Sequence, residues 1–201
     1  MTPPVSRWNH NIHYHPLILA ALPPGCDRVL DVGCGEGLLA RDLSTRVRHV
    51  VAMDKDAPTI ALAREASSAS NVDYVLGDVL QHPFEPESFD AVVSIATVHH
   101  IGAAPALSRM RQLLRPGGHL AVVGLARSRT PRDLAFDAAG AVGMVVYKRT
   151  KGWSEVRAPT VWPPPETYRQ VRQTASSLLP GVHYRRHVLF RYSLVWTKPS
   201  P

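Results

Sequence analysis

The stretch Val29–Gly37, VLDVGCGEG, constrains this chain more than any other, because it places glycines at positions 33, 35 and 37. A short apolar run leads into them, and Leu38, Leu39 and Leu43 follow at helical spacing. A glycine-rich turn between a strand and a helix lets the backbone approach a ligand closely, with the helix N-terminus facing it. The stretch therefore predicts a loop that cradles a nucleotide or an adenosyl group.

The rest of residues 28–125 alternates between strand and helix signals. Helical patterns occur at 59–66 and at 104–114, the second ending before Pro116-Gly117-Gly118. Near-continuous apolar strands separated by helices indicate a parallel sheet covered on both faces. We expect a Rossmann-like, doubly wound α/β fold whose ligand lies beyond the carboxyl ends of the strands. The runs that predict its strands are 28–32, 49–53, 72–76, 89–96 and 119–125.

The pattern changes after residue 125. Thr130 and Pro131 are typical of a helix start, and we expect that helix to run to about Tyr147. Residues 148–165 indicate an irregular, proline-rich connection, so that 126–165 is expected to cover the substrate side. Residues 182–198 predict two closing strands, and the helix before them presents one apolar face: Tyr168, Val171, Ala175, Leu178 and Leu179.

Length and composition favour a single cytoplasmic domain. The 201 residues suit one domain with a sizeable core. No apolar run approaches the roughly 20 residues that span a bilayer, and the first residues lack the apolar centre of a signal peptide. The two cysteines, Cys26 and Cys34, do not suggest a disulfide framework. We expect no membrane contact and a reducing compartment.

The charge is distributed unevenly along the chain. Residues 1–100 carry 7 Lys and Arg against 12 Asp and Glu, a net charge of −5. Residues 101–201 carry 16 against 4, a net charge of +12. A basic half can receive an acidic substrate or a nucleic acid, and it can equally be a solvated surface. Composition leaves both alternatives open.

The glycine spacing helps to separate the possible cofactors. A dinucleotide-binding loop follows the pattern G-x-G-x-x-G, whereas this loop follows G-x-G-x-G and has Leu38 at the position of the third glycine. The spacing therefore argues against NAD or FAD. Asp54, at the end of the second predicted strand, is suited to accept hydrogen bonds from ribose hydroxyls. Because that role occurs with either kind of cofactor, Asp54 alone decides little.

Four motifs in order resemble one known family. VLDVGCGEG, VVAMDKD, LGDVLQHPFEPESFDAVVS and LLRPGGHLAVV are similar in order and spacing to the class I S-adenosylmethionine-dependent methyltransferases. The resemblance is close over 28–125, and the closing strands extend it. It implies a seven-stranded sheet with an antiparallel edge hairpin in one domain covering 1–201. Its expected parts are a cap (1–27), a cofactor-binding core (28–125), a substrate-side cover (126–165) and a closing helix and hairpin (166–201).

The resemblance implies a role for each residue of the glycine loop. The backbone of Gly33, Cys34 and Gly35 would pass close to the methionine part of S-adenosylmethionine. Asp31 would orient the loop and reach the ammonium group, directly or through water. The end of the fourth strand would lie beside the methionine and the methyl group, at Ser94, Ile95 and Ala96.

The adenosine part would meet a second set of residues. By the same resemblance, Asp54 would bind the ribose hydroxyls and Lys55 would flank the adenine. Asp78 would accept a hydrogen bond from the adenine amine, and the amide of Val79 would meet a ring nitrogen. A turn former at Asp54 and a loop cap at Asp78 are the structural alternatives.

Histidines supply the candidate catalytic groups. His99 and His100 follow the fourth strand at the mouth of the predicted site, where an imidazole could remove a proton from the acceptor. Alternatively, one of them packs beneath the cofactor. The earlier cluster of His10, His13 and His15 has no carboxylate or cysteine beside it, so we expect no metal site.

The N-terminal segment and two tryptophans are further candidates for the cover of the site. We expect residues 8–16 to form an N-terminal cap with Tyr14 or a histidine closing over the cofactor. Alternatively, these residues are surface groups on an ordered arm. Trp153 and Trp162 either stack on a planar acceptor or fix the cover to the core.

The sequence therefore predicts transfer of a methyl group from S-adenosylmethionine to an O, N or C atom of a small molecule, by direct displacement. The acceptor is expected to be aromatic or acidic, and S-adenosylhomocysteine is the expected product. One alternative is methylation of tRNA or another nucleic acid, motivated by the basic half. The other is a non-catalytic S-adenosylmethionine-binding protein, motivated by the absence of an unambiguous base. The oligomeric state stays open.

Overall fold

A computed structural model describes residues 8–154 and 161–200. Within them, seven strands form one sheet in the order β3-β2-β1-β4-β5-β7-β6. The first five strands pair in parallel, β7 pairs antiparallel with β5, and β6 pairs antiparallel with β7. The doubly wound, mostly parallel sheet with an antiparallel edge hairpin is thereby confirmed. Its strands are β1 (Arg28–Val32), β2 (His49–Asp54), β3 (Val72–Leu76), β4 (Phe89–Ile95), β5 (Leu114–Gly124), β6 (His183–His187) and β7 (Arg191–Thr197).

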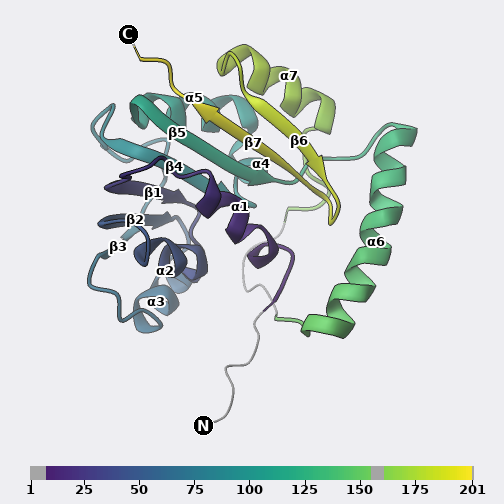
Figure 1. Cartoon of the computed structure of the whole chain (residues 1–201), viewed down its shortest axis with the longest axis horizontal. Helices are drawn as coiled ribbons and strands as arrows, with labels where there is room; N and C mark the ends of the chain where they lie inside the picture. The colour runs from purple at the N-terminus through teal and green to yellow at the C-terminus, as the bar shows by residue number, and fades with distance from the viewer. Residues whose placement is uncertain (1–7, 155–160, 201) are drawn as a thin grey trace.

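Helices cover both faces of this sheet (Figure 1). One face carries α4 (Val98–Ile101), α5 (Ala103–Leu113) and α7 (Tyr168–Leu178). The other face carries α1 (His15–Ala20), α2 (Leu38–Ser44) and α3 (Ala57–Glu65). The short 3-10 turn η1 (Ile12–Tyr14) leads into α1. Strands buried on both sides explain the near-continuous apolar runs of the sequence.

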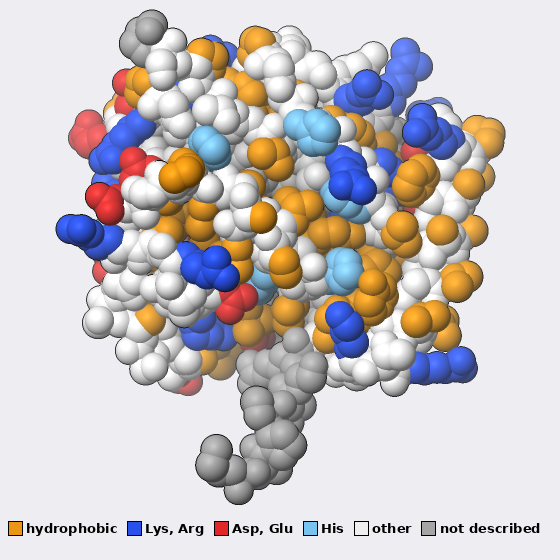
Figure 2. Space-filling model, viewed as in Figure 1, with side chains coloured by type: hydrophobic (Ala, Val, Ile, Leu, Met, Phe, Trp, Pro, Cys, Tyr) orange, Lys and Arg blue, Asp and Glu red, His pale blue; other side chains and the backbone are white. Residues whose placement is uncertain are grey.

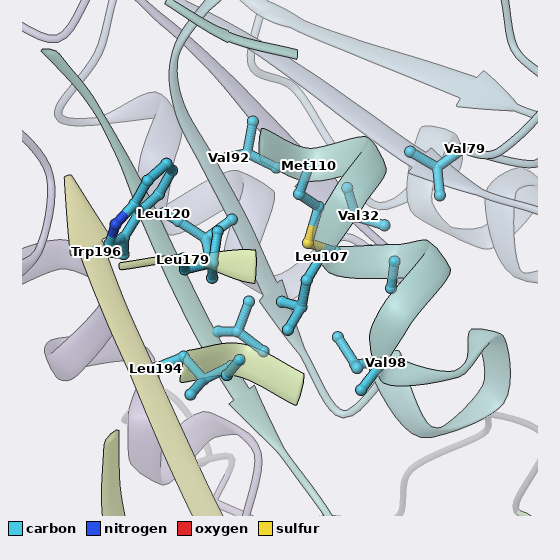
Figure 3. Close-up of a cluster of buried hydrophobic side chains, with 14 of the residues drawn as sticks. Val32, Val79, Val92, Val98, Leu107, Met110, Leu120, Leu179, Leu194 and Trp196 are labelled. Atoms are coloured by element: carbon cyan, nitrogen blue, oxygen red, sulfur yellow. The ribbon is translucent and has the colours of Figure 1, made fainter. Parts of the chain in front are cut away.

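The larger of the two apolar clusters lies between the sheet and α5 and α7 (Figure 3). Leu107 and Met110 of α5 are fully buried there, against Leu120 of β5 and Leu194 of β7. Their three-residue spacing places both side chains on the face that meets the sheet. This cluster fixes β4 and β5, and with them the edge at which the candidate site residues gather.

The strand β5 begins earlier than its apolar run predicts. Phe89 pairs with Leu114, and the pairing resumes only at Ala91 with His119, so residues 115–118 bulge out of the ladder. Gly117 adopts φ 76°, and its N–H donates to the carbonyl of Lys198 at 2.9 Å. The segment Pro116-Gly117-Gly118 was expected to precede the strand, and it instead forms a bulge within it.

The helix α6 (Pro131–Lys151) starts as predicted and ends later than predicted. Thr130 caps it, because its hydroxyl accepts a hydrogen bond from the Asp133 N–H at 3.2 Å. The expected end at about Tyr147 is wrong by one turn. Lys148, Arg149 and Lys151 occupy that last turn, where positive charge is favourable beside the negative end of the helix dipole.

The position of α6 separates it from both helical layers. It lies at the edge of the molecule beside the β6–β7 hairpin (Figure 1), with Gly140 buried against Leu189 and Phe190. Its outward face exposes Leu134, Val142, Val145 and Val146, and hydrophobic and basic side chains are mixed along this edge in Figure 2. None of the helices in the described ranges combines the length and apolar character of a membrane span.

Removal of the Leu107 side chain tests the importance of this core. Leu107→Ala should lower the free energy of unfolding by about 2–5 kcal/mol, because the cavity cannot collapse between α5 and the sheet. Urea denaturation measures the loss. Leu62→Ala, on the outer side of α3 at 38% exposure, is the matched control and should change stability by less than about 1 kcal/mol. Equal losses in the two variants would contradict the placement of the core.

Candidate active site

The glycine loop joins β1 to α2 at the carboxyl edge of the sheet. The N–H groups of Gly33 and Cys34 both donate to the carbonyl of Met53, at 2.8 and 2.9 Å. A Cβ atom on Gly33, which has φ 75°, would lie 2.0 Å from the Thr97 hydroxyl, so this position has no room for a side chain. At Gly35, with φ 54°, a Cβ would meet nothing within 4 Å. The loop is therefore packed on one side and open on the other.

Cys34 lies within this loop as a buried thiol. Burial, together with the charges of Asp31 and Asp54, raises the pKa of Cys34 well above its usual range. The thiol form is inert, since the thiolate is the nucleophile and the metal ligand. Cys34 therefore contributes its backbone and small size rather than any chemistry of its own.

Asp31 is a buried carboxyl group without a full set of partners. The residue is 1% exposed, and its Oδ2 atom has no hydrogen-bond partner among the described residues. Burial, and then the charge of Asp54, raise the pKa of Asp31 to about 8. The Oε1 atom of Glu36 is also buried without a partner. Two such acceptors beside an open loop fit a ligand that brings hydrogen-bond donors and positive charge.

Asp54 ends β2 and supports the loop in this structure. Its Oδ2 atom accepts from the Gly35 N–H at 2.9 Å, and its Oδ1 atom accepts from the Asp56 N–H at 3.0 Å. The turn-forming role and the ribose-binding role are compatible, because each carboxylate oxygen has two lone pairs. Lys55 follows on the exposed surface.

At the end of β3, Asp78 caps a turn. Its Oδ1 atom accepts from the Leu80 N–H at 2.9 Å, while its side chain stays exposed. Val79 is buried in the core, and its carbonyl accepts from the Arg109 side chain at 3.1 Å. These contacts fix the backbone on which an adenine contact would depend.

The end of β4 lies beside the end of β1, from which the glycine loop starts. The strand order of the sheet reverses between these two strands. The hydroxyl of Ser94 donates to the Val32 carbonyl at 2.8 Å and is fully buried, so this side chain ties β4 to β1. Ala96 adopts φ 58°, a left-handed conformation that is costly for a residue with a Cβ. Ile95 and Ala96 therefore offer main-chain groups in a constrained turn rather than reactive side chains.

His99 and His100 lie on α4 with their rings 4.1 Å apart. Burial, His100 and Arg191 lower the pKa of His99 to about 4, and its Nδ1 atom has no partner among the described residues. Burial and the charge of Lys55 lower the pKa of half-buried His100, while Asp54 opposes that shift. Both rings are thus neutral at pH 7. The charges of Lys55 and Asp54 act on His100, and the charge of Arg191 acts on His99.

The N-terminal segment forms an ordered arm, residues 8–14, that packs against the hairpin and α6. Trp8 is buried and stacks on Tyr147, with ring centroids 5.0 Å apart. The Tyr14 hydroxyl donates to the carbonyl of Val188 in the hairpin turn. Because this hydroxyl is engaged, Tyr14 joins the arm to the hairpin, and only its ring remains available to a ligand.

The earlier histidine cluster does not form a metal centre in the described ranges. The His15 Nδ1 atom lies 2.6 Å from the Asp42 carboxylate, which links α1 to α2. The ring of His13 packs against Tyr14 and Tyr147, and the ring of His10 packs against Trp153. Burial lowers the pKa of His10 to about 4.

The two tryptophans of the cover, Trp153 and Trp162, lie in different surroundings. Trp153 packs on Trp8 and on the Lys148 ammonium group, 4.3 Å from the ring centroid, so it fixes the cover to the arm. Trp162 is 70% exposed and lines a cavity of about 150 Å³ at the end of β5, together with Leu125, Tyr168 and Phe190. Residues 155–160 of the expected cover lie outside the described residues.

Sequence reasoning missed Arg191 and Asn11. Arg191 begins β7 and is 2% exposed, and its Nη2 atom donates to the Oδ1 atom of Asn11 at 2.8 Å. The available signal was a lone arginine inside the apolar run VLFRYSLVW. A charged residue in a strand that is otherwise buried requires an explanation.

These features define an α/β protein with a ligand site at the carboxyl edge of its sheet, beside the switch between β1 and β4. Comparisons with known proteins then identify the kind of ligand. The methyltransferase domain family matches residues 30–122. An uncharacterized methyltransferase of Mycobacterium tuberculosis strain H37Rv is 40% identical over 195 residues, covering 96% of this chain and 98% of that protein.

Two further similarities agree. A ubiquinone biosynthesis O-methyltransferase of Xanthomonas axonopodis pv. citri is 37% identical over 128 residues, covering 62% of this chain and 53% of that protein. A crystal structure of a SAM-dependent methyltransferase from Aquifex aeolicus has the same fold, with a TM-score of 0.62 and 18% identity over 91% of this chain and 88% of that one. The chain belongs to the class I S-adenosylmethionine-dependent methyltransferases.

The raised pKa of Asp31 predicts a pH dependence of the ligand-free protein. Between about pH 4 and pH 8 the folded state keeps the Asp31 proton and the unfolded state loses it, so stability falls as pH rises. The slope is at most about 1.4 kcal/mol per pH unit. Asp31→Asn removes this titration, so its stability relative to wild type should increase from pH 5 to pH 7.5.

Thermal and urea unfolding at the two pH values measure this difference. Glu65→Gln, which changes an exposed carboxylate on α3, is the control and should follow wild type at both values. A stability difference between Asp31→Asn and wild type that stays constant with pH would show that Asp31 is ionised in the folded state.

Proposed function

We propose that this chain methylates an O, N or C atom of a small, planar acceptor by direct displacement. The observation that carries the proposal is the set of unpaired buried acceptors, Asp31 Oδ2 and Glu36 Oε1, beside the open side of the glycine loop. The bound cofactor supplies a methyl group already activated on a sulfonium. The protein therefore has to hold the acceptor in line and exclude water, and such alignment can contribute on the order of 7–11 kcal/mol.

We assign the methionine part of the cofactor to the glycine loop between β1 and α2. The Asp31 carboxyl would pair with the ammonium group of the methionine part. The positive charge of that group would lower the pKa of Asp31 and so favour its ionised form. The backbone of Gly33, Cys34 and Gly35 would pass along the chain of the methionine. The main chain of Ile95 and Ala96 would lie opposite, while Ser94 keeps its hydroxyl on Val32 and supports that turn.

The adenosine part is assigned to the ends of β2 and β3. The Asp54 carboxylate would accept from the ribose hydroxyls with its remaining lone pairs. Lys55 would flank the adenine, Asp78 would accept from its amine and the Val79 amide would meet a ring nitrogen. Tyr14 would contribute the face of its ring, as part of the arm that covers the site.

The acceptor is assigned to the cavity beyond the end of β5. The cavity at the end of β5 is lined mainly by apolar and aromatic side chains, which suits a planar molecule. Two relatives carry names with small-molecule acceptors, a ubiquinone biosynthesis O-methyltransferase and a demethylmenaquinone methyltransferase. We propose an aromatic or acidic acceptor for this chain on these grounds.

The parts of the chain divide accordingly. Residues 28–125 would bind the cofactor, 1–27 and 126–165 would cap the acceptor, and 166–201 would close the sheet within one domain. The free thiols Cys26 and Cys34 are consistent with a reducing, cytoplasmic setting. Proton removal, where the acceptor needs it, is assigned to His100, which is half-buried and lies within reach of the Asp54 charge.

Transfer of label tests the function and this assignment together. With S-adenosylmethionine labelled in its methyl group, the protein should label a component of a small-molecule cell extract.

His100→Gln should lower that turnover roughly 100-fold and leave cofactor affinity unchanged. Because the pKa of His100 is lowered, the wild-type rate should persist to a lower pH than a base with the ordinary pKa of histidine would allow. Absence of label in every fraction would contradict the function, and undiminished turnover in both His99→Gln and His100→Gln would leave these residues as packing groups.

Loss of the Asp54 carboxylate tests the ribose assignment. Asp54→Ala should weaken cofactor binding by about 1.5–3 kcal/mol, roughly 10- to 150-fold, because the ribose hydroxyls lose a charged acceptor. Calorimetric titration of S-adenosylhomocysteine measures the change. Asp73→Ala, which removes an exposed carboxylate from β3, should bind as wild type does. Unchanged affinity in folded Asp54→Ala protein would refute the assignment.

A further inference from the structure

Arg191 is a buried cation for which the described residues supply no counter-ion. It is 2% exposed, and no carboxylate of the described ranges forms a salt bridge with it. Its Nη2 atom donates to Asn11 Oδ1 at 2.8 Å and its Nη1 atom to the Phe190 carbonyl at 3.4 Å, while its Nε atom has no partner. Burial of a charged group without a paired charge is strongly unfavourable. A purely structural hydrogen bond to Asn11 would not require a cation.

A second arginine of the β6–β7 hairpin, Arg186, is neutralised in the usual way by a carboxylate. Arg186 donates to the Asp137 carboxylate of α6 at 3.0 Å and stacks on the Tyr168 ring, 3.5 Å from its centroid. Both arginines are largely buried in the same sheet edge. Arg186 is neutralised by a carboxylate, whereas no carboxylate of the described residues neutralises Arg191.

Among the described residues, the titratable side chains coupled to Arg191 are uncharged at pH 7, and a further cation, Arg186, donates from its Nη1 atom to the Arg191 carbonyl at 3.0 Å. The charge of Arg191 lowers the pKa values of His10 and His99, which places both rings within its field. Tyr14 and Tyr168 are the titratable groups that oppose the lowering of the pKa of Arg191, and burial raises the pKa of each of them to about 12. The described residues around this guanidinium therefore supply no negative charge, and a bound anion can supply it.

Arg191 directly follows Phe190, one of the residues that line the cavity assigned to the acceptor. Tyr192, the next residue, pairs with Gly124, so Arg191 lies just beyond the carboxyl end of β5. The charge of Arg191 acts on His99, and the charges of Lys55 and Asp54 act on the adjacent His100. The two histidines of α4 thus lie between the fields of Arg191 and of Asp54.

We propose that Arg191 binds a carboxylate group of the methyl acceptor. A guanidinium suits this ligand, because its N–H groups match the two oxygens of a carboxylate. The Nε–H group of Arg191 supplies one donor. At the Nη2 atom, the carboxylate of the acceptor replaces or shares the hydrogen bond to the Asn11 side chain. The inference rests on the proposed function, since it names the class of acceptor that the same site takes.

Fractionation of the labelling reaction tests the acceptor class. A small-molecule extract is divided on an anion exchanger at pH 7, and each fraction is incubated with labelled S-adenosylmethionine. The acceptor activity should be retained with the anions. Arg191→Met should lower labelling at limiting extract at least 10-fold, Arg191→Lys should restore part of it, and affinity for S-adenosylhomocysteine should stay as in wild type.

A binding measurement tests the anion site without turnover. Benzoate and benzamide, which match in shape and differ in charge, are titrated into the complex with S-adenosylhomocysteine. Wild type should prefer benzoate at least 10-fold, and Arg191→Met should lose that preference. Asn11→Ala is the control for a purely structural role, because it removes the neutral partner and leaves the cation, so it should keep the preference. Circular dichroism and melting temperature confirm that each variant folds.

The outcomes separate the two proposals. Acceptor activity found only in the fractions that pass the exchanger would overturn the carboxylate inference, as would equal binding of benzoate and benzamide or a preference that survives in Arg191→Met. Absence of label in every fraction would contradict the proposed function instead, and the benzoate preference would then decide on the anion site by itself.

Discussion

The attachment of the glycine loop to its neighbours is the constraint on which the rest of the site depends. Two consecutive N–H groups of the loop share the Met53 carbonyl at the end of β2, and Gly33 meets Thr97 beyond the end of β4 at a distance that excludes any Cβ. Three adjacent strand ends are therefore locked together before any ligand arrives. The open side of Gly35 is then the free space that this packing leaves, and the carboxyls of Asp31 and Asp54 line the loop from below and beside it.

The fold buries two ionisable groups of opposite type, an acid and a base. Asp31 lies at the end of β1 and Arg191 at the start of β7, and both retain an unpaired polar atom. Arg191 lowers the stability of the ligand-free chain because it has no counter-ion within the described residues, whereas Asp31 avoids that cost below about pH 8 by keeping its proton. Ligand chemistry explains both together: a positively charged amino acid part beside one group and an anionic acceptor beside the other.

Local sequence patterns predicted those parts of the molecule that local physics controls. β1 has the bounds that its apolar run predicts, and α6 begins at the predicted cap, because period and capping act within a few residues. The bulge at 115–118 was missed, since its hydrogen bond comes from Lys198 at the far end of the chain. Arg186 and Arg191 could not be distinguished by sequence for the same reason. Their partners, Asp137 and Asn11, are 49 and 180 residues away.

The titration of the two histidines limits the chemistry of the site. A base whose pKa lies near 4 removes a proton poorly from a phenol or an amine, because the driving force for transfer falls with the pKa of the base. Burial, His100 and Arg191 place the pKa of His99 in that range. The neutral His99 ring is therefore better suited to accept a hydrogen bond from the methyl acceptor and so to position it. His100 differs because the Asp54 charge opposes the effects of burial and Lys55. The same Arg191 that weakens His99 as a base stabilises an anion beside it, so an acceptor that arrives already ionised would need no base at all.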